Sequence, residues 1–481
     1  MSTPSAGGRR VATRRRPRPS RRPTRGAFVG AALVVLAAAL SVVGGLVQAP
    51  PEAAPSPSSV PVDEVTTACL GWPGAASSRS STLTAPVPDT GDVSDGGGLT
   101  AGPVGSKGTP ETVGPRGHVR ALDAPGSGEG LVVTATGAAA VGRATFQADR
   151  ADGAGIALQP CLQARSRWSF TGGGAGLDHR SQLVLANVDP GPAVVDVVVQ
   201  GPSGVAEDVG TRGITVAPGE VRTIDMVDVA PQSDELMVAV DATRGRVAAG
   251  LADSFATQPA AEPGREWVPG QQEASRTMTL APLPRLADRR SLVVSNPTDR
   301  EAVVEVRVSG ESGSFAPTGL EEVRVPARSV VTEDLGEAVG RAAAAVVLRS
   351  PVPVTATVRS ARGRDVSYAG AVSVLDGPAA ALLEENADAA VQLTAGAAAA
   401  RARVTAYSTS GKEVDSTEMK VPATATAAWS PKGKAAYVVV DPVKGDVSGG
   451  VSVAGGSGDS QVPLQALPLR LERPVVVPVV R

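Results

Sequence analysis

The stretch WSFTGGGAGLDHRSQLVLANVDP, residues 168–190, concentrates side chains that could do chemistry. It contains three consecutive glycines, Gly172–Gly174, and His179, one of only two histidines in the chain. A phosphate-binding loop would need a Gly-Lys-Ser/Thr sequence opening a helix, and a dinucleotide fingerprint would need a strand–helix–strand unit. Here no lysine follows the glycines, and the next segment alternates like a strand. The glycines therefore favour a tight turn that uses positive φ.

The histidines are weak candidates for catalysis. His179 lies in LDHRS, and the matching stretch of a later repeat, ADRRS, has Arg289 in its place. His118 lies in the polar sequence GPRGHVRAL. We therefore expect His179 to be a solvated turn residue and His118 a loop residue.

Other catalytic groupings are missing from the sequence. The chain has neither a G-x-S-x-G nucleophile elbow nor an S-x-x-K motif. Acidic pairs such as Glu321–Glu322 come without the aromatic-lined cleft that glycoside hydrolysis requires. Two cysteines and two scattered histidines make no metal-ligand cluster. The sequence thus predicts a non-enzymatic protein with no cofactor and no metal.

Only two cysteines are present, Cys69 and Cys161. In an oxidising compartment they most simply form one disulfide, which would close a loop of about 92 residues. Two unrelated free thiols are the alternative interpretation.

Aromatic residues make up only 2% of the chain, and three tryptophans recur at similar spacing. Trp72, Trp168 and Trp267 each lie near the start of a repeat. A recurring tryptophan is usually buried in a core or between domains, because it covers a large area. The sharper hypothesis is a sugar-stacking platform. We therefore take Trp72, Trp168, Trp267 and Phe170 as a possible binding surface.

Internal repeats organise the segments that carry these residues. The sequence RSQLVLANVDPGPAVVDVVVQGPSG, residues 180–204, matches RSLVVSNPTDREAVVEVRVSGESG, residues 290–313. Further on, residues 236–254 match residues 436–454. We predict four β-units, at residues 65–162, 163–260, 272–370 and 380–460, and a C-terminal segment, residues 461–481.

Each unit reads as β-structure. Short Val-rich runs end at glycines, and turn signals recur about every 8–12 residues, which is typical of an antiparallel sandwich. Short helices are expected only at residues 334–345 and 377–390. The predicted fold is all-β, with tandem immunoglobulin-like β-sandwich repeats after one N-terminal transmembrane helix.

The N-terminus predicts a membrane topology. Residues 1–26 contain nine arginines and no acid, and residues 27–49 contain no charge. An apolar run of that length can span a bilayer, and the arginines place residues 1–26 in the cytoplasm. Residues 27–49 are then a signal anchor and residues 50–64 a Pro/Ser/Ala-rich linker. A signal peptide cleaved after Ala49 is the alternative.

Charge excludes one class of partner. Nine of the 46 basic residues lie in residues 1–26, so the rest carries 37 basic and 48 acidic residues. An acidic ectodomain argues against nucleic acid as a ligand.

The motifs also resemble a known family. Trp168, Phe170 and Gly172–Gly174, the strand that ends at Gly201–Gly204, and GRVAAG at residues 245–250 resemble the actinobacterial envelope proteins catalogued as domain of unknown function 5719. The resemblance covers about residues 65–460 and implies an envelope location and repeated β-domains, without an assigned activity.

These observations together predict a single-pass protein of the cell membrane with its C-terminal domains outside. We expect a non-enzymatic scaffold or binding module of the cell envelope, whose partner is an envelope protein. The alternative is a glycan-binding or accessory protein for cell-wall polysaccharide assembly.

Overall fold

A computed structural model describes most of the chain beyond the predicted linker. The described residues are 34, 36, 58–73, 77–86, 97–122, 129–150, 155–206, 210–256, 263–271, 273–383, 388–455 and 458–473. Their contacts separate residues 59–471, here called the ring unit, from a second unit that consists of residues 1–58 and 472–481.

The predicted all-β class is confirmed. Among the described elements of the ring unit, helical structure is confined to α2 (Met226–Val229) and two 3₁₀ turns, Gly137–Ala139 and Gly336–Ala338. The predicted helix at residues 377–390 is wrong, because β29 (Ala379–Leu382) occupies its start and is hydrogen-bonded on both sides. Sheet pairing there overrides the helix preference of alanine.

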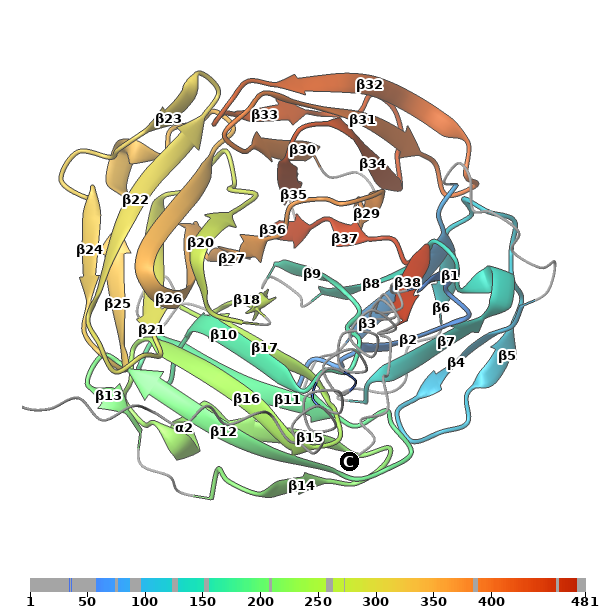
Figure 1. Cartoon of the computed structure of the whole chain (residues 1–481), viewed down its shortest axis with the longest axis horizontal. Helices are drawn as coiled ribbons and strands as arrows, with labels where there is room; N and C mark the ends of the chain where they lie inside the picture. Colours follow the sequence, from blue (N-terminus) through green and yellow to red (C-terminus); the bar gives the residue numbers. More distant parts are fainter. Residues whose placement is uncertain are drawn as a thin grey trace, which may run out of the picture. The chain divides into compact units, whose positions relative to one another are not determined.

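Four sandwiches follow one another along the chain, each with an outer and an inner antiparallel sheet (Figure 1). The first has outer strands β2 (Glu64–Cys69), β7 (Leu131–Thr136), β4 (Leu99–Pro103) and β5 (Thr109–Glu111), and inner strands β6 (Arg120–Leu122), β3 (Ser77–Thr84), β8 (Arg143–Arg150) and β9 (Ile156–Pro160). The second has outer strands β13 (Gly204–Val205), β14 (Ile214–Val216), β12 (Ala193–Gly201), β16 (Leu236–Arg244), β10 (Arg167–Gly173) and β19 (Gly270–Gln271), and inner strands β15 (Val221–Asp225), β11 (His179–Ala186), β17 (Ala248–Phe255) and β18 (Gly264–Val268).

The third and fourth sandwiches repeat this order. In the third sandwich the outer strands are β23 (Gly313–Phe315), β24 (Glu322–Val325), β22 (Ala302–Gly310), β20 (Ser275–Leu280) and β28 (Ala371–Val372). The inner strands are β25 (Ser329–Asp334), β21 (Arg289–Asn296) and β27 (Asp365–Ala369), and the long β26 (Ala345–Arg362) belongs to both sheets. In the fourth sandwich the outer strands are β32 (Glu413–Val421), β31 (Ala400–Tyr407), β34 (Tyr437–Lys444), β29 and β37 (Gln465–Ala466). The inner strands are β33 (Thr426–Trp429), β30 (Asp388–Ala395), β35 (Val447–Gly455) and β36 (Gly458–Pro463).

Burial differs between the two sheets of a sandwich. Outer strands alternate: in β12, Ala193, Val195, Val197 and Val199 are buried in the core and the residues between them are partly exposed. Inner strands such as β17 are buried on almost every residue. Successive residues of a strand point to opposite faces. The inner sheets therefore pack on their own outer sheet with one face and on neighbouring sandwiches with the other.

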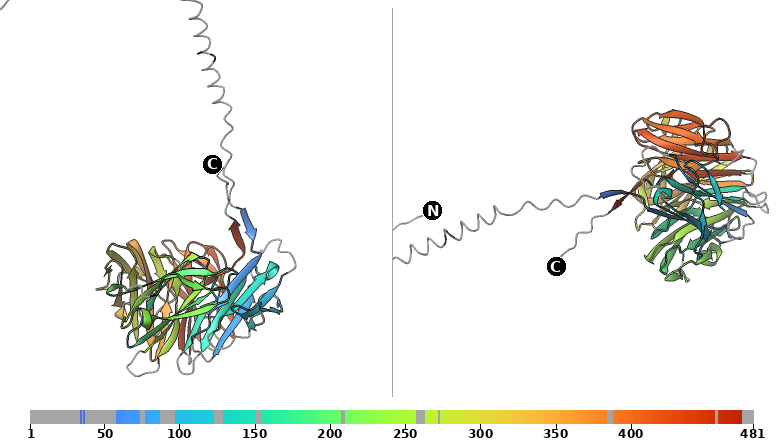
Figure 2. Two further views of the ribbon diagram at one scale, coloured as in Figure 1. Left: turned by 90° about the horizontal axis from the view of Figure 1, so that it is seen from below. Right: turned by 90° about the vertical axis from the view of Figure 1, so that its right-hand side faces the viewer.

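The sandwiches close into a ring around four central strands. Each of β9, β18, β27 and β36 contacts two of the others, in the order β9–β18–β27–β36–β9. Viewed edge-on, the strands of the sandwiches cross the thickness of the ring (Figure 2). At their first residues the central strands meet closely: a Cβ on Gly155 or Gly458 would lie 2.2 or 2.8 Å from an Asp365 carboxylate oxygen. Both glycines also have a positive φ, of +95° and +128°, which residues with a side chain rarely adopt.

The two ends of the ring unit lie together. A two-stranded sheet joins β1 (Ser58–Pro61) and β38 (Arg470–Arg473), and the Val62 amide donates to the Leu469 carbonyl at 3.2 Å. The predicted tail (1–26) and the first part of the linker lie outside the described residues, as does the predicted anchor (27–49) apart from residues 34 and 36. Among the described residues, no helix has the length and apolar character needed to cross a bilayer.

Candidate functional site

A cavity of about 820 Å³ lies where the chain leaves the central strands. Every sandwich contributes to its wall: Pro160 ends β9, Pro269 follows β18, Gly370 follows β27, and Pro463 ends β36. Because the strands converge at their first residues, the cavity opens at the opposite end of the central strands. We call it the axial cavity.

A buried amide in its wall is left without partners. Gln461 of β36 is only 4% exposed, and neither its Nε2 nor its Oε1 has a hydrogen-bond partner among the described residues. The Oε1 of Gln465, also in the wall, is likewise unpaired there. An unsatisfied buried polar group costs about 1–3 kcal/mol. Gln461 and Gln465 thus place one amide nitrogen and two amide oxygens without described partners in residues of this wall.

The tryptophans do not form an exposed platform. Trp72, Trp168 and Trp267 are each 4% exposed and Phe170 is 1% exposed, so the predicted binding surface is wrong. The Trp168 ring stacks on Phe170, with centroids 6.2 Å apart, and its Nε1 donates to the Val247 carbonyl at 2.9 Å. Both rings belong to the core of the second sandwich. Core packing, the usual role of a recurring tryptophan, holds for this pair.

Trp72 and Trp267 join the first two sandwiches. Their rings meet edge to face at 5.1 Å, and the Trp267 Nε1 donates to Asp149 Oδ2 at 2.7 Å. Edge-to-face contact is a favoured geometry for aromatic pairs. Trp168 and Trp267 reach the axial cavity only as nearly buried parts of its wall.

The predicted disulfide is present between Cys69 and Cys161. In the other sandwiches, the segment after the central strand pairs with the first outer strand, as β19 pairs with β10. In the first sandwich this pairing is a single bridge, between Ala68 and Leu162. The disulfide lies directly beside that bridge and reinforces it.

The glycine triplet forms a β-bulge at the end of β10 instead of the predicted tight turn or a ligand loop. The register shifts between Thr171 and Gly173, and Gly172 has a φ of +112°. A Cβ on Gly172 would lie 2.8 Å from Thr357 Oγ1 of the third sandwich. The Gly174 amide donates to Ser181 Oγ at 2.8 Å, so it is already occupied. The glycines allow two sandwiches to approach closely.

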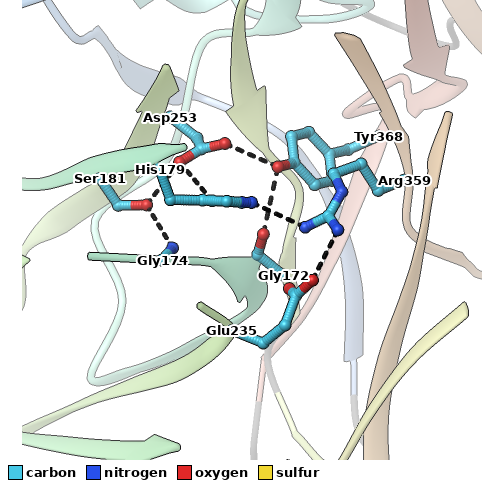
Figure 3. A network of polar contacts seen from close by, with 8 residues as sticks. All are labelled: Gly172, Gly174, His179, Ser181, Glu235, Asp253, Arg359 and Tyr368. Atoms are coloured by element: carbon cyan, nitrogen blue, oxygen red, sulfur yellow. Dashed lines mark hydrogen bonds and ion pairs between the residues drawn. The ribbon is translucent and has the colours of Figure 1, made fainter. Parts of the chain in front are cut away.

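His179 is not the solvated turn residue that the sequence predicts. It is the first residue of β11 and is 7% exposed. Its Nδ1 lies 3.3 Å from Asp253 Oδ1, and its Nε2 lies 2.9 Å from Arg359 Nη1 (Figure 3). The prediction failed because Arg359 comes from the third sandwich, whose packing against LDHRS cannot be read from local sequence.

The residues around His179 form a polar network between the second and third sandwiches (Figure 3). The Tyr368 hydroxyl donates to Asp253 Oδ2 at 2.7 Å, and Arg359 pairs with Glu235 at 2.6 Å. Burial acts to raise the pKa of Asp253, but His179 and hydrogen bonds from Ser181 and Tyr368 outweigh it and hold that pKa below its ordinary value. Asp253 is therefore a buried anion that faces buried cationic and polar groups.

Serine, histidine and aspartate meet here without the geometry of a catalytic triad. The Ser181 hydroxyl donates to Asp253 Oδ1 at 2.6 Å, so its proton points away from the histidine. The Nε2 of His179, which would take the proton of a nucleophile, faces a guanidinium instead. The network holds two sandwiches together. One sequence signal could have revealed it: Asp253 is an acid within a run of small and apolar residues, RVAAGLADS.

A second polar group lies where the central strands begin. The Asp365 Oδ2 accepts from the Asp459 amide, and Asp459 Oδ1 accepts from Arg362 Nη2 at 2.7 Å. Burial raises the pKa of Asp365 to about 7, and the nearby Asp459 adds to this. Burial also raises the pKa of Asp459 to about 6, against the opposing effect of Arg362.

These shifts predict that the ring unit loses stability as pH rises. Both folded-state pKa values are raised, so the folded state holds protons that the unfolded chain releases above pH 4. The contribution of Asp365 should fall between about pH 4 and pH 7, by on the order of 2–4 kcal/mol at about 1.4 kcal/mol per pKa unit. Asp365→Asn keeps the acceptor oxygen and should flatten this dependence. Urea unfolding at pH 5 and pH 8 measures it.

The exposed Asp228 provides the matched control. Asp228→Asn should leave the pH dependence of the wild-type protein unchanged. Equal pH dependence of the wild type and Asp365→Asn would contradict the prediction.

Comparison with known proteins gives one family. A model described as a family of unknown function (DUF5719) matches residues 119–432, which confirms the resemblance seen in the sequence. The match begins within the first sandwich and ends within the fourth. No curated protein and no solved structure matches the chain.

Proposed function

The chain belongs to the DUF5719 family, and from the geometry of its ring unit we propose that it is a binding module of the cell envelope. In this proposal a signal anchor at residues 27–49 holds it in the cell membrane, and the ring unit lies outside the cell. It performs no catalysis and binds an envelope protein in the axial cavity. The charge pattern of the first 49 residues supports the topology.

The observation that carries the proposal is the axial cavity with its unsatisfied amide. Four repeats converge on one concave site, and a buried glutamine in its wall lacks partners among the described residues. Binding sites are typically concave and mainly apolar, with few polar groups that set specificity. A side-chain amide can donate one hydrogen bond and accept another, and a peptide group offers the complementary acceptor and donor.

The contacts of Ser181, His179 and Asp253 support a non-enzymatic role, because they occupy the groups that catalysis would need. Its serine proton goes to an aspartate and its histidine faces Arg359. All three residues are buried, with exposed fractions of 0–7%.

A cell-wall glycan is the second candidate ligand. Gln461 and Gln465 could bind sugar hydroxyls, since an amide can donate to and accept from a hydroxyl group. The buried tryptophans give this candidate less support than their spacing suggested.

We also propose that the four sandwiches are immunoglobulin-like. Each sets two antiparallel sheets face to face over a core of alternating residues.

Site-specific crosslinking in the native envelope tests the binding proposal. A photoreactive phenylalanine analogue replaces Val374, a 56% exposed residue in the cavity wall, in the full-length chain. The matched control carries it at Phe315, which is 45% exposed and lies on β23, away from the cavity. We expect a discrete adduct from position 374, and Gln461→Ala should reduce its yield at least about fivefold, as loss of one buried hydrogen bond implies.

The outcomes separate the two ligands. An adduct that protease shifts supports a protein partner, and one that only polysaccharide-degrading enzymes shift supports a glycan. Equal adducts from positions 374 and 315, or none from position 374, would refute the axial cavity as the binding site.

A further inference from the structure

A second, smaller cavity lies in the first sandwich. It has a volume of about 200 Å³ and is lined by side chains of both sheets, including Leu99 from the outer sheet and Thr82 and Thr84 from the inner one. Arg120 and Arg143 also line it. Only Arg143 is a buried charge, which is costly unless it is paired, whereas the Arg120 side chain is 41% exposed.

Arg143 is buried and has no ionic partner among the described residues. It is 5% exposed; its Nε donates to the Ala139 carbonyl at 2.9 Å, and its Nη1 lies 3.4 Å from Thr82 Oγ1. Its Nη2 has no hydrogen-bond partner in the described part of the chain. Burial and the nearby Arg116 lower its pKa to about 10, so it stays charged at neutral pH.

The charge around this cavity is positive. The Nε of Arg120 is also buried and unpaired among the described residues, while its Nη2 pairs with Glu111. Arg116 donates to the carbonyls of Val141 and Ala138. Of these three guanidinium groups, only that of Arg120 forms an ion pair with a described carboxylate, and Arg120 and Arg143 each keep one nitrogen without a partner among the described residues.

The repeats show that this arginine is a departure from the common pattern. In the inner sheet of the first sandwich Arg143 lies opposite Thr84. In the other three sandwiches the same pair of positions holds Ala186 with Ala248, Ser295 with Thr355, and Ala395 with Val447. Small or apolar residues suffice for the fold at this position, so the packing of a sandwich does not require the charge.

We propose that this cavity binds the carboxylate or phosphate group of a small anionic ligand. The Nη2 of Arg143 and the Nε of Arg120 donate to its oxygens, and their positive charge balances it. Guanidinium groups suit such oxyanions in geometry and charge. The site is separate from the axial cavity and does not depend on the ligand that binds there.

Isothermal titration of the full-length protein in detergent micelles tests the proposal. Inorganic phosphate and acetate are titrated separately, at an ionic strength kept constant with chloride. We expect one of them to bind with a stoichiometry of one. Arg143→Gln should weaken that binding at least about tenfold, Arg120→Gln should weaken it less, and the exposed Arg324→Gln should leave it unchanged.

If Arg143→Gln does not fold, as judged by near-ultraviolet circular dichroism, Arg120→Gln and Thr84→Val replace it. Binding of phosphate alone or of acetate alone identifies the ligand group. Binding that survives Arg143→Gln, or that Arg324→Gln also removes, overturns the proposal, as does the absence of binding for both anions.

Discussion

Arg359→Met is expected to destabilise the ring unit by about 3–5 kcal/mol. Arg359 is 5% exposed, pairs with Glu235 at 2.6 Å, and lies next to His179 and over the ring of Phe255. Methionine fills a similar volume but leaves the buried Glu235 without its cation and removes a positive charge near the buried Asp253. Removing one partner of a buried ion pair destabilises the folded state by far more than the intact pair stabilises it. Urea unfolding of the full-length protein in micelles measures the loss.

A surface pair provides the control. Arg401 pairs with Glu418 at 3.2 Å, with both side chains at least 40% exposed. Arg401→Met should therefore cost less than about 1 kcal/mol. If Arg359→Met and Arg401→Met lose similar stability, the network between the second and third sandwiches does not hold them together as described.

Loss of the disulfide is expected to have the second large effect. Cys161→Ser, paired with Cys69→Ser, should lower the unfolding free energy by about 2–5 kcal/mol. The bond spans 92 residues, so it strongly restricts the unfolded chain. It also supports the segment after β9, which pairs with β2 through only one bridge. Unfolding with and without reductant measures the effect.

The double serine variant serves as its own control for the reductant. Reductant should destabilise the wild type to about the level of the variant and should leave the variant unchanged. A wild-type protein whose stability does not change after complete reduction would show that the bond contributes nothing to the ring unit.

Much of each sandwich can be predicted from sequence. Runs such as AVVDVVVQG alternate because one face of an outer strand packs in the core and the other meets solvent. Inner strands such as AAGLADSF are buried on nearly all residues, and their small side chains carry little periodicity. The sequence therefore shows the strands but not the ring, which depends on contacts between residues more than 90 positions apart, as between Asp149 and Trp267.

Contacts between residues distant in sequence also explain the errors at the candidate sites. The repeat comparison paired His179 with Arg289, and both residues do begin the matching inner strands, β11 and β21. Their surroundings differ, because Arg359 of the third sandwich packs on His179 while Arg289 remains exposed. Nothing in the sequence DSQVPLQAL marks Gln461 as a residue of a cavity wall, because the other walls come from the other three sandwiches.

The order of central strands, β9–β18–β27–β36–β9, has a consequence for how the protein unfolds. Open repeat arrays have terminal repeats that fray first, and their stability behaves as a sum over nearest neighbours. A closed ring has no terminal repeat, so opening any one boundary exposes the faces of two sandwiches at once. We expect residues 59–471 to melt in one cooperative transition, and loss of any single sandwich should release the other three from the folded state together.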